Sequence, residues 1–314
     1  MIFEFMKNHA NKYPVNKMAK VLAVSRAGYY KYIALKESAT SRKNNELLVK
    51  IKAISRKNRQ VYGSPRIHAE LVKQGETCSR KRIAKIMRKN SIQAKTKRRW
   101  KASAKGSRDL SRIAPNLLNQ NFKVDCANKV WVTDITYVFT KQGWLYVSTV
   151  LDLYSRKIVG LSMSSRLDTD LVLRSLNQAV VHRSPSSGLI LHSDRGCQYT
   201  STAYINNAKI KGFVLSMSST GNCYDNAAME TFFHTLKTEH VFFNNYLTRK
   251  DAIESIFEYV EVFYNRQRSH STLNYMSPVE FEAEQIPHFW QKMTSRVKLA
   301  RPAIEVNKSR IHSV

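Results

Sequence analysis

The sequence predicts an α/β protein in which a mixed five-stranded sheet with flanking helices follows a set of small helical units. Three observations support this fold class. Residues 1–113 carry 30 Lys and Arg against 6 Asp and Glu, and they contain repeated apolar patterns at helical spacing. After Pro115, short apolar runs alternate with amphipathic segments, as in a sheet covered by helices. Three apolar runs come first in succession, which favours a mixed sheet over a purely parallel one.

The distribution of charge indicates the class of partner. The chain has a formal net charge of +29, of which residues 1–113 hold +24. A basic part joined to a nearly neutral part suits a protein that binds a polyanion with the basic part and has a separate functional domain in the other part. Nucleic acid is the expected polyanion. When Lys and Arg bind its phosphates, they displace the bound counterions, and the release of these counterions favours binding. A membrane fits poorly, since no apolar run reaches about 18 residues and MIFEFMKNHA lacks the layout of a signal peptide.

The cysteines give no sign of a metal site or a disulfide framework. Cys78, Cys126, Cys197 and Cys223 are widely scattered and show no spacing typical of zinc ligands. We therefore expect reduced thiols in a cytoplasmic protein.

Two helix-turn-helix patterns occupy the basic part, one in residues 1–36 and one in residues 37–94. In the first, PVNKMAKVLAVSRAGYYKYI has apolar residues at helical spacing, and Ser25 is suited to cap its second helix. In the second, SPRIHAELVKQ is expected to bury Val72 with its other apolar residues, and Ser79 is suited to cap RKRIAKIMRKN. One such unit fits either a plain helical hairpin with a solvated basic face or a DNA-binding unit. Two in tandem within so basic a segment favour DNA binding.

Residues 95–120 are expected to form a basic linker, because KTKRRWKASAKGSRDLSR has little periodicity and includes Gly106. Such a segment can follow a phosphate backbone. Together with the second helical unit, it supplies most of the cations that we expect to contact DNA. These are Arg80, Lys81, Arg82, Lys85, Arg98 and Arg99.

The core of the fold is expected within residues 121–246, and a helical segment with a basic tail is expected at 247–314. The expected strands span residues 130–139, 144–154, 157–164, 188–194 and 213–218. The expected helices span residues 168–183, 200–211, 225–240 and 249–267.

Two acidic residues of the core lie in or at the end of apolar strands. Asp134 is in the middle of VWVTDITYVF and shares a face with Val132 and Val138. A lone carboxylate there carries a desolvation penalty of several kcal/mol unless it is paired or bound to a metal. Asp194 ends the run LILHS, which is the strand-end position at which open sheets present ligands.

A third acidic residue, Glu230, lies on a predicted helix beside a cation. In NAAMETFFHTLK, the apolar residues form one stripe, while Glu230, His234 and Lys237 cluster largely away from it. Such a charged face is usually only solvated. The spacing changes this interpretation, because 35 residues separate Asp194 from Glu230 and Lys237 follows seven positions after Glu230.

This spacing resembles the signature of the DDE transposases of the retroviral-integrase-like superfamily, which have two Asp, then 35 residues and a Glu, then a Lys or Arg seven positions on. Four surrounding segments strengthen the resemblance: VWVTDITYV, LHSDRGCQYTS, GNCYDNAAMETFFHTLKTE and YNRQRSHSTLNYMSPVEF. They are similar to the transposase encoded by the second reading frame, OrfB, of the insertion-sequence family three. The similarity covers nearly the whole chain.

The resemblance implies a ribonuclease-H-like integrase catalytic core, in which Asp134, Asp194 and Glu230 are the catalytic and metal-binding residues. Three carboxylates suit Mg²⁺ or Mn²⁺, because these hard cations prefer oxygen ligands, and two ions are expected. Two ions can activate the attacking oxygen and stabilise the leaving oxygen of a phosphoryl transfer. The implied activity is DNA cleavage and strand transfer at the ends of an insertion sequence, through a circular form of the element.

The resemblance also implies partners and a location. The expected partners are the element ends and the target DNA, further copies of the chain on that DNA, and the upstream-frame protein OrfA. No sustained leucine heptad occurs here, so the chain is expected either to act alone or to be the catalytic half of a frameshift fusion with OrfA. The expected location is the bacterial cytoplasm, in association with the nucleoid.

Several residues keep two interpretations. Asp152 is either a further metal ligand or a structural partner of Arg156. Lys237 is expected to position DNA at the rim of the metal site, and Arg266 and Arg268 are expected to contact DNA. The tail, residues 287–314, has six Lys and Arg and one Glu, and it is either a solvated end or another phosphate contact.

The same features bear on two other functions. A DNA-binding regulator with a decayed core would be favoured if one of the three acids were missing, and none is. A stand-alone nuclease has less need of the basic N-terminal 113 residues and of Lys237.

Overall fold

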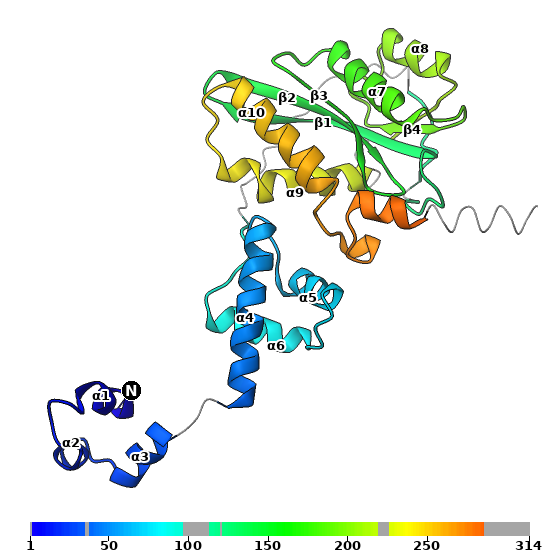
Figure 1. Cartoon of the computed structure of the whole chain (residues 1–314). Coiled ribbons are helices and arrows are strands. Elements are labelled where there is room, and N and C mark those ends of the chain that lie inside the picture. Colours follow the sequence, from blue (N-terminus) through cyan, green and yellow to red (C-terminus); the bar gives the residue numbers. More distant parts are fainter. Residues whose placement is uncertain (1, 35–37, 97–112, 120, 219–225, 286–314) are drawn as a thin grey trace, which may run out of the picture. The chain divides into compact units, whose positions relative to one another are not determined.

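The computed structural model describes residues 2–34, 38–96, 113–119, 121–218 and 226–285. The chain divides into two compact units, Met1–Ala94 and Lys95–Val314 (Figure 1). In the part of the chain that is described, no helix is long and apolar enough to cross a membrane.

The first three helices pack around a small core of their own. They are α1 (Ile2–His9), α2 (Val15–Val21) and α3 (Arg26–Ala34). Met6, Met18, Ala19 and Tyr29 form the buried cluster between them. The Ser25 Oγ accepts a hydrogen bond of 3.0 Å from the Gly28 amide, so Ser25 caps α3 as predicted.

A second helical group contains the other predicted helix pair and one long helix that was not predicted. Its helices are α4 (Ala39–Lys57), α5 (Ser64–Lys73) and α6 (Arg80–Lys89). The Ser79 side chain accepts from the Arg82 amide and caps α6, as predicted. The prediction that Val72 is buried is wrong: it is 52% exposed, because α5 buries only Ile67 and Leu71.

The second unit contains the predicted mixed sheet of five strands. The strands are β1 (Val130–Thr140), β2 (Gly143–Asp152), β3 (Ile158–Ser164), β4 (Ile190–Ser193) and β5 (Val214–Met217). Their order in the sheet is β3-β2-β1-β4-β5. The first three strands are antiparallel neighbours, whereas β4 runs parallel to β1 and β5 runs parallel to β4. The sheet therefore changes from antiparallel to parallel at β1.

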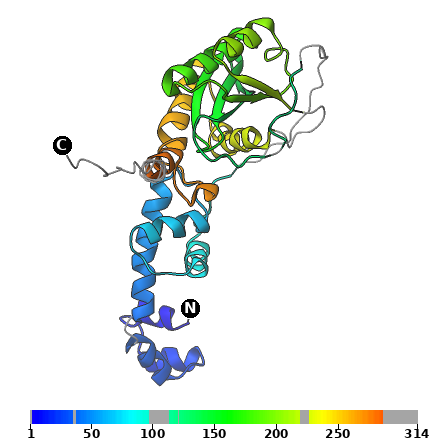
Figure 2. The same cartoon turned by 90° about the vertical axis from the view of Figure 1, so that its right-hand side faces the viewer.

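Helices cover both faces of this sheet (Figures 1 and 2). The helices are α7 (Thr169–Arg183), α8 (Thr202–Ile210), α9 (Ala227–Glu239) and α10 (Arg249–Glu258). Helix α7 lies on β2 and β3, and α9 and α10 lie on the other face (Figure 1). A Cβ on Gly160 would come within 2.1 Å of the Ser175 carbonyl oxygen, so glycine at this position of β3 allows α7 to pack closely.

The helix predicted over residues 249–267 is shorter and less regular than expected. Helix α10 ends at Glu258, and the chain continues as a π-helical turn, η4 (Tyr259–Tyr264). Four of the apolar residues of η4 remain buried, namely Tyr259, Val260, Phe263 and Tyr264, whereas Val262 is exposed. A further helix, residues 278–285, is the last one among the described residues and follows a short connection.

A buried ion pair joins the end of α9 to the segment after η4. Arg268 is only 4% exposed, and its Nε and one terminal nitrogen each donate to Glu239 at 2.7 Å. Burial opposes the charged guanidinium, but the hydrogen bonds and charge of Glu239 hold the pKa of Arg268 above its ordinary value. This placement does not support the predicted contact of Arg268 with DNA, because Glu239 occupies the guanidinium.

We expect Arg268→Met to lower the free energy of unfolding by roughly 3–5 kcal/mol, because it leaves the Glu239 carboxylate buried without its partner. Urea unfolding followed by circular dichroism would measure this change. Arg266→Met is the matched control, since Arg266 is exposed and should change stability by less than about 0.5 kcal/mol. Equal stabilities of the two variants would show that the pair contributes little to folding.

Candidate active site

The pairing of β1 with β4 brings two of the predicted acids together. The last parallel pair of these strands joins Val132 to His192. Asp134 and Asp194 each lie two residues further along the chain. They are therefore at the same level of neighbouring strands, on the same face of the sheet. Two carboxylates far apart in sequence meet at the end of β4.

Local hydrogen bonds fix both carboxylates. The Asp134 Oδ1 accepts from the Ile135 amide at 2.7 Å. The Asp194 Oδ1 accepts from the Gly196 amide at 2.8 Å, just after β4 ends at Ser193. A Cβ on Gly196 would lie 3.0 Å from the same Oδ1, so a larger residue there would crowd the carboxylate.

The third acid, Glu230, lies in the first turn of α9. The apolar stripe of this helix is buried as predicted, and Glu230 is exposed on the opposite side. The stripe consists of Ala228, Met229, Phe232, Phe233 and Leu236. Packing of α9 on β1 thus carries Glu230 to the side of the sheet on which Asp134 lies.

The electrostatics of Asp134 report how close these groups are. Burial and the negative charge of Asp194 raise its pKa to about 8, and the charge of Glu230 adds to this effect. The hydrogen bond from Ile135 and the positive charge of Lys237 act in the opposite direction. The charges of Asp194, Glu230 and Lys237 therefore lie within electrostatic range of Asp134.

The donor set fits hard divalent cations. Like-charged carboxylates this close together are stabilised by a cation between them, and oxygen donors are those that Mg²⁺ and Mn²⁺ prefer. Within the described ranges, no three Asp, Glu, His or Cys side chains converge tightly enough to enclose one ion. The arrangement fits ions that take one or two carboxylates each and complete their shells with water and phosphate oxygens, as Mg²⁺ usually does.

Lys237 has a contact that the sequence did not predict. Its Nζ lies 5.0 Å from the centroid of the Tyr137 ring. Strand β4 pairs with β1 only as far as Val132, so β4 does not cover the edge of β1 beside Asp134 and Tyr137. Lys237 therefore contacts the Tyr137 ring, and its charge also acts on Asp134.

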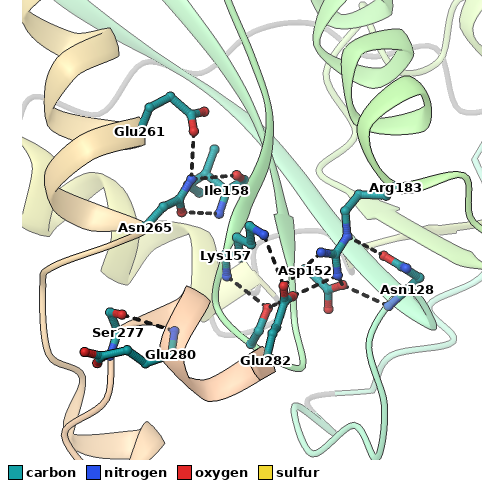
Figure 3. Close-up of polar contacts among 11 residues, drawn as sticks. Asn128, Asp152, Lys157, Ile158, Arg183, Glu261, Asn265, Ser277, Glu280 and Glu282 are labelled. Carbon is teal, nitrogen blue, oxygen red and sulfur yellow. Dashed lines mark hydrogen bonds and ion pairs between the residues drawn. The ribbon is translucent and has the colours of Figure 1, made fainter. Parts of the chain in front are cut away.

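Asp152 is a structural residue and not a neighbour of the three acids. It pairs with Trp131 across β1 and β2, whereas Asp134 pairs with Thr149, so Asp152 and Asp134 point to opposite faces of the sheet. The Asp152 carboxylate accepts from the Asn128 amide at 2.8 Å and from Arg183 at 3.3 Å (Figure 3). The expected partner Arg156 was wrong, and Arg183 of α7 takes its place.

Arg183 also holds the C-terminal helix against the sheet. Two of its nitrogens donate to Glu282 at 2.9 and 2.8 Å, and the Lys157 Nζ donates to the same carboxylate at 3.1 Å (Figure 3). Burial opposes ionisation of Glu282, but Arg183 outweighs it and lowers the pKa of this carboxyl. The network connects α7, β2, β3 and residues 278–285 on the side of the sheet away from Asp134.

Two buried polar residues beneath the site were missed in the sequence. His192 is fully buried, with its ring nitrogens 2.8 Å from the Ser216 Oγ and 3.1 Å from the Ser218 Oγ. The Tyr199 hydroxyl lies 3.3 Å from the Thr133 Oγ1, and burial and the charge of Asp134 raise its pKa. A histidine inside the apolar run LILHS was the available sign of a polar connection between β4 and β5.

The predicted DNA contacts have different surroundings. Arg82 is half-buried and donates through Nε to the Asn44 Oδ1 at 2.8 Å, so part of its guanidinium binds α4. The exposed members of the predicted set are Arg80, Lys81, Lys85 and Arg266. Arg98, Arg99 and the tail at 287–314 lie outside the described residues.

Comparison with known proteins identifies the domains. An integrase core domain family matches residues 124–223, and a second integrase core domain family matches residues 230–286. An HTH-like domain family matches residues 42–100, which include α4, α5 and α6. The two integrase matches contain all three acids.

Individual relatives agree with these matches over nearly their whole length. The chain is 41% identical to the 31 kDa protein of insertion element IS600 from Shigella sonnei, over 84% of this chain and 97% of that protein. It is 35% identical to the transposase InsF of insertion sequence IS3A from Escherichia coli K12, over 90% of this chain and 98% of that protein. The HTLV-2 integrase catalytic core domain, solved in complex with magnesium, aligns over 50% of this chain and 97% of its own at 14% identity and a TM-score of 0.39. The chain belongs to the IS3 family of insertion-sequence transposases.

Proposed function

We propose that this transposase cleaves DNA at the ends of an insertion sequence and joins the freed strand to a target, with Asp134, Asp194 and Glu230 as its catalytic residues. The observation that carries the proposal is the juxtaposition of Asp134 and Asp194 on neighbouring strands, within electrostatic range of Glu230. All three acids are present, which argues against a regulator with a decayed core.

The three carboxylates are proposed to hold two Mg²⁺ or Mn²⁺ ions. Such ions supply activation of the attacking oxygen and neutralisation of charge on the phosphate and the leaving oxygen. Asp134 and Asp194 are fixed by backbone hydrogen bonds, so they provide preorganised oxygen ligands on the sheet. Glu230 is exposed on α9 and provides a carboxylate on the side from which DNA approaches.

The chemistry is one displacement at phosphorus, used with two attacking groups. In cleavage, a water oxygen forms a bond to phosphorus while the bond to the 3′ oxygen breaks, and the 3′ oxygen takes up a proton. In joining, the resulting 3′-hydroxyl attacks a target phosphate in the same way and releases a new 3′-hydroxyl. Lys237 is proposed to bind a phosphate beside the reacting one, because its charge lies on the open edge of β1 next to Asp134.

The basic N-terminal part is proposed to bind the element ends. Residues 1–113 hold +24 of the +29 formal charges, and Arg80, Lys81 and Lys85 are exposed on α6. This helix follows α5 within the HTH-like domain, the position of a recognition helix in such units. The chain is further proposed to assemble as several copies on DNA, with OrfA as a partner or fused to it.

Asp134→Asn, Asp194→Asn and Glu230→Gln should each reduce cleavage and joining by at least about a hundredfold, because each removes a charged ligand of the ions that are proposed to act on the reacting phosphate. Binding of an element-end duplex should change little, since the binding cations lie elsewhere. Cleavage of a labelled element end and electrophoretic mobility shift would measure the two properties. Asp125→Asn is the control, because this side chain is 78% exposed and pairs with Lys129. A fully active carboxylate variant would remove that residue from the site.

Millimolar Mg²⁺ or Mn²⁺ should raise the unfolding temperature of the full chain, because a cation that binds only the folded state stabilises it. The shift should be several degrees in the wild type and much smaller in Asp134→Asn, which loses one ligand. Differential scanning fluorimetry with and without EDTA would measure it. An identical shift in both proteins would place the bound ion at another site.

Replacing Arg80, Lys81 and Lys85 together by Ala should weaken DNA binding and flatten its dependence on salt. The slope of log affinity against log salt should fall by about 1 for each lost phosphate contact. Fluorescence anisotropy at several salt concentrations would measure it. The control is a triple Ala variant of the exposed core cations Arg166, Lys209 and Lys250. If both triple variants changed the slope equally, the electrostatic binding of DNA would not be specific to α6.

A further inference from the structure

Three aromatic side chains at the end of the β1–β2 hairpin form an exposed patch, which we call the aromatic platform. Its members are Tyr137, Phe139 and Trp144, which are 48%, 64% and 46% exposed. The Trp144 ring meets both other rings edge to face, with centroid distances of 5.3 Å in each case. By contrast, Trp131 on the same strand is fully buried. The platform is therefore a continuous aromatic surface and not a set of isolated exposed residues.

The platform is held rigidly. Phe139 and Trp144 are cross-strand partners, and the Thr140 Oγ1 donates to the Gly143 carbonyl at 2.7 Å to close the hairpin. Gly143 has a φ of +103°, which glycine adopts without strain. The neighbouring segment also ties down the hairpin, because the Arg249 Nε donates to the Trp144 carbonyl at 3.1 Å. A ligand would thus meet aromatic rings that are already in position.

Cationic groups flank the platform, and one of them links it to the acids. The Lys237 Nζ lies 5.0 Å from the centroid of the Tyr137 ring, and the charge of the same lysine acts on Asp134. The Arg249 side chain lies against the hairpin turn, where a Cβ on Gly143 would come within 3.0 Å of its terminal nitrogen. Aromatic faces between two cations suit a ligand that carries flat rings on an anionic backbone.

We propose that Tyr137, Phe139 and Trp144 stack against unpaired bases of the DNA strand next to the reacting phosphate. This inference rests on the proposed function, because the acids define where that phosphate lies. Base pairs must open locally for a base to reach a protein ring, and stacking on an aromatic side chain offsets this cost. The platform would therefore favour DNA ends with unpaired bases beside the cleavage position. A hydrophobic protein partner or a second copy of the chain needs neither Lys237 nor Arg249 at the edges.

The test is a comparison of binding to two versions of one element end in Ca²⁺, with the full chain. One version is fully paired, and the other has three mismatched bases flanking the cleavage position. Wild-type protein should bind the mismatched duplex more tightly by about tenfold or more, and Phe139→Leu with Trp144→Leu should reduce this ratio to near one. A 5-iododeoxyuridine among the mismatched bases should crosslink to the platform, as mapped by mass spectrometry.

Leucine keeps the apolar surface but removes the aromatic ring, so this variant separates stacking from hydrophobic contact. Phe257→Leu is the matched control, because this ring is 50% exposed on α10, and it should keep the wild-type ratio. If the platform variant kept the wild-type ratio of affinities for the mismatched and paired duplexes, the proposal would be overturned. The same holds if the variant kept this ratio but had a smaller oligomeric mass by light scattering, because the platform would then contact a second copy of the chain. This test measures DNA binding and not catalysis. If Asp134→Asn still cleaved DNA, the proposed catalytic site would be refuted, but the preference for the mismatched duplex could still be measured.

Discussion

The parallel pairing of β1 with β4 is the interaction on which the candidate site depends. Its register, with Val132 opposite His192, puts Asp134 level with Asp194. Mutual repulsion and burial make this arrangement unfavourable for two ionised carboxylates, as the raised pKa of Asp134 indicates. Other interactions must hold the strands in place, and the apolar cluster around Trp131, Leu191 and Met217 supplies them. The fold therefore holds two carboxyl groups close together, and a bound cation would stabilise their ionised forms.

The rest of the unit supports this pair from both faces. Helix α7 packs on β2 and β3 because Gly160 admits its backbone, and Arg183 at its end connects Asp152 and Glu282. On the other face, α9 buries its apolar stripe and presents Glu230. The buried pair of Glu239 and Arg268 fixes the far end of α9. The ion pairs of Asp152 and Glu282 with Arg183 lie on the face of the sheet opposite to Asp134.

Much of this architecture could be predicted from the sequence, because period-two and helical patterns are local. The five strands, the apolar stripe of α9 and the caps Ser25 and Ser79 are readable from a few neighbouring residues. The spacing of Asp134, Asp194 and Glu230 suggested their proximity through resemblance to DDE transposases. The sequence did not predict ion pairs between residues that are far apart in the chain. Nothing near Asp152 indicates that Arg183 is its partner.

Other misses have the same origin. Arg268 follows two residues after the exposed Arg266 and looks equally available in the sequence, but Glu239, far away in the chain, binds it. The contact of Lys237 with Tyr137 depends on where β4 stops pairing, which no local pattern gives. The sequence could thus indicate candidate residues for the chemistry, but not which of their neighbours are structural.

The carboxylates of Asp134 and Asp194 are proposed to be metal ligands, and an exchange of one ligand atom would test this role. In Asp194→Cys, a soft thiolate replaces a hard carboxylate, so Mg²⁺ should bind poorly while a thiophilic ion such as Cd²⁺ should bind well. The measurement is joining of a pre-nicked element end to target DNA in each ion. We expect no joining in Mg²⁺ and partial recovery in Mn²⁺ or Cd²⁺. Joining at the wild-type rate in Mg²⁺ would show that Asp194 is not a metal ligand.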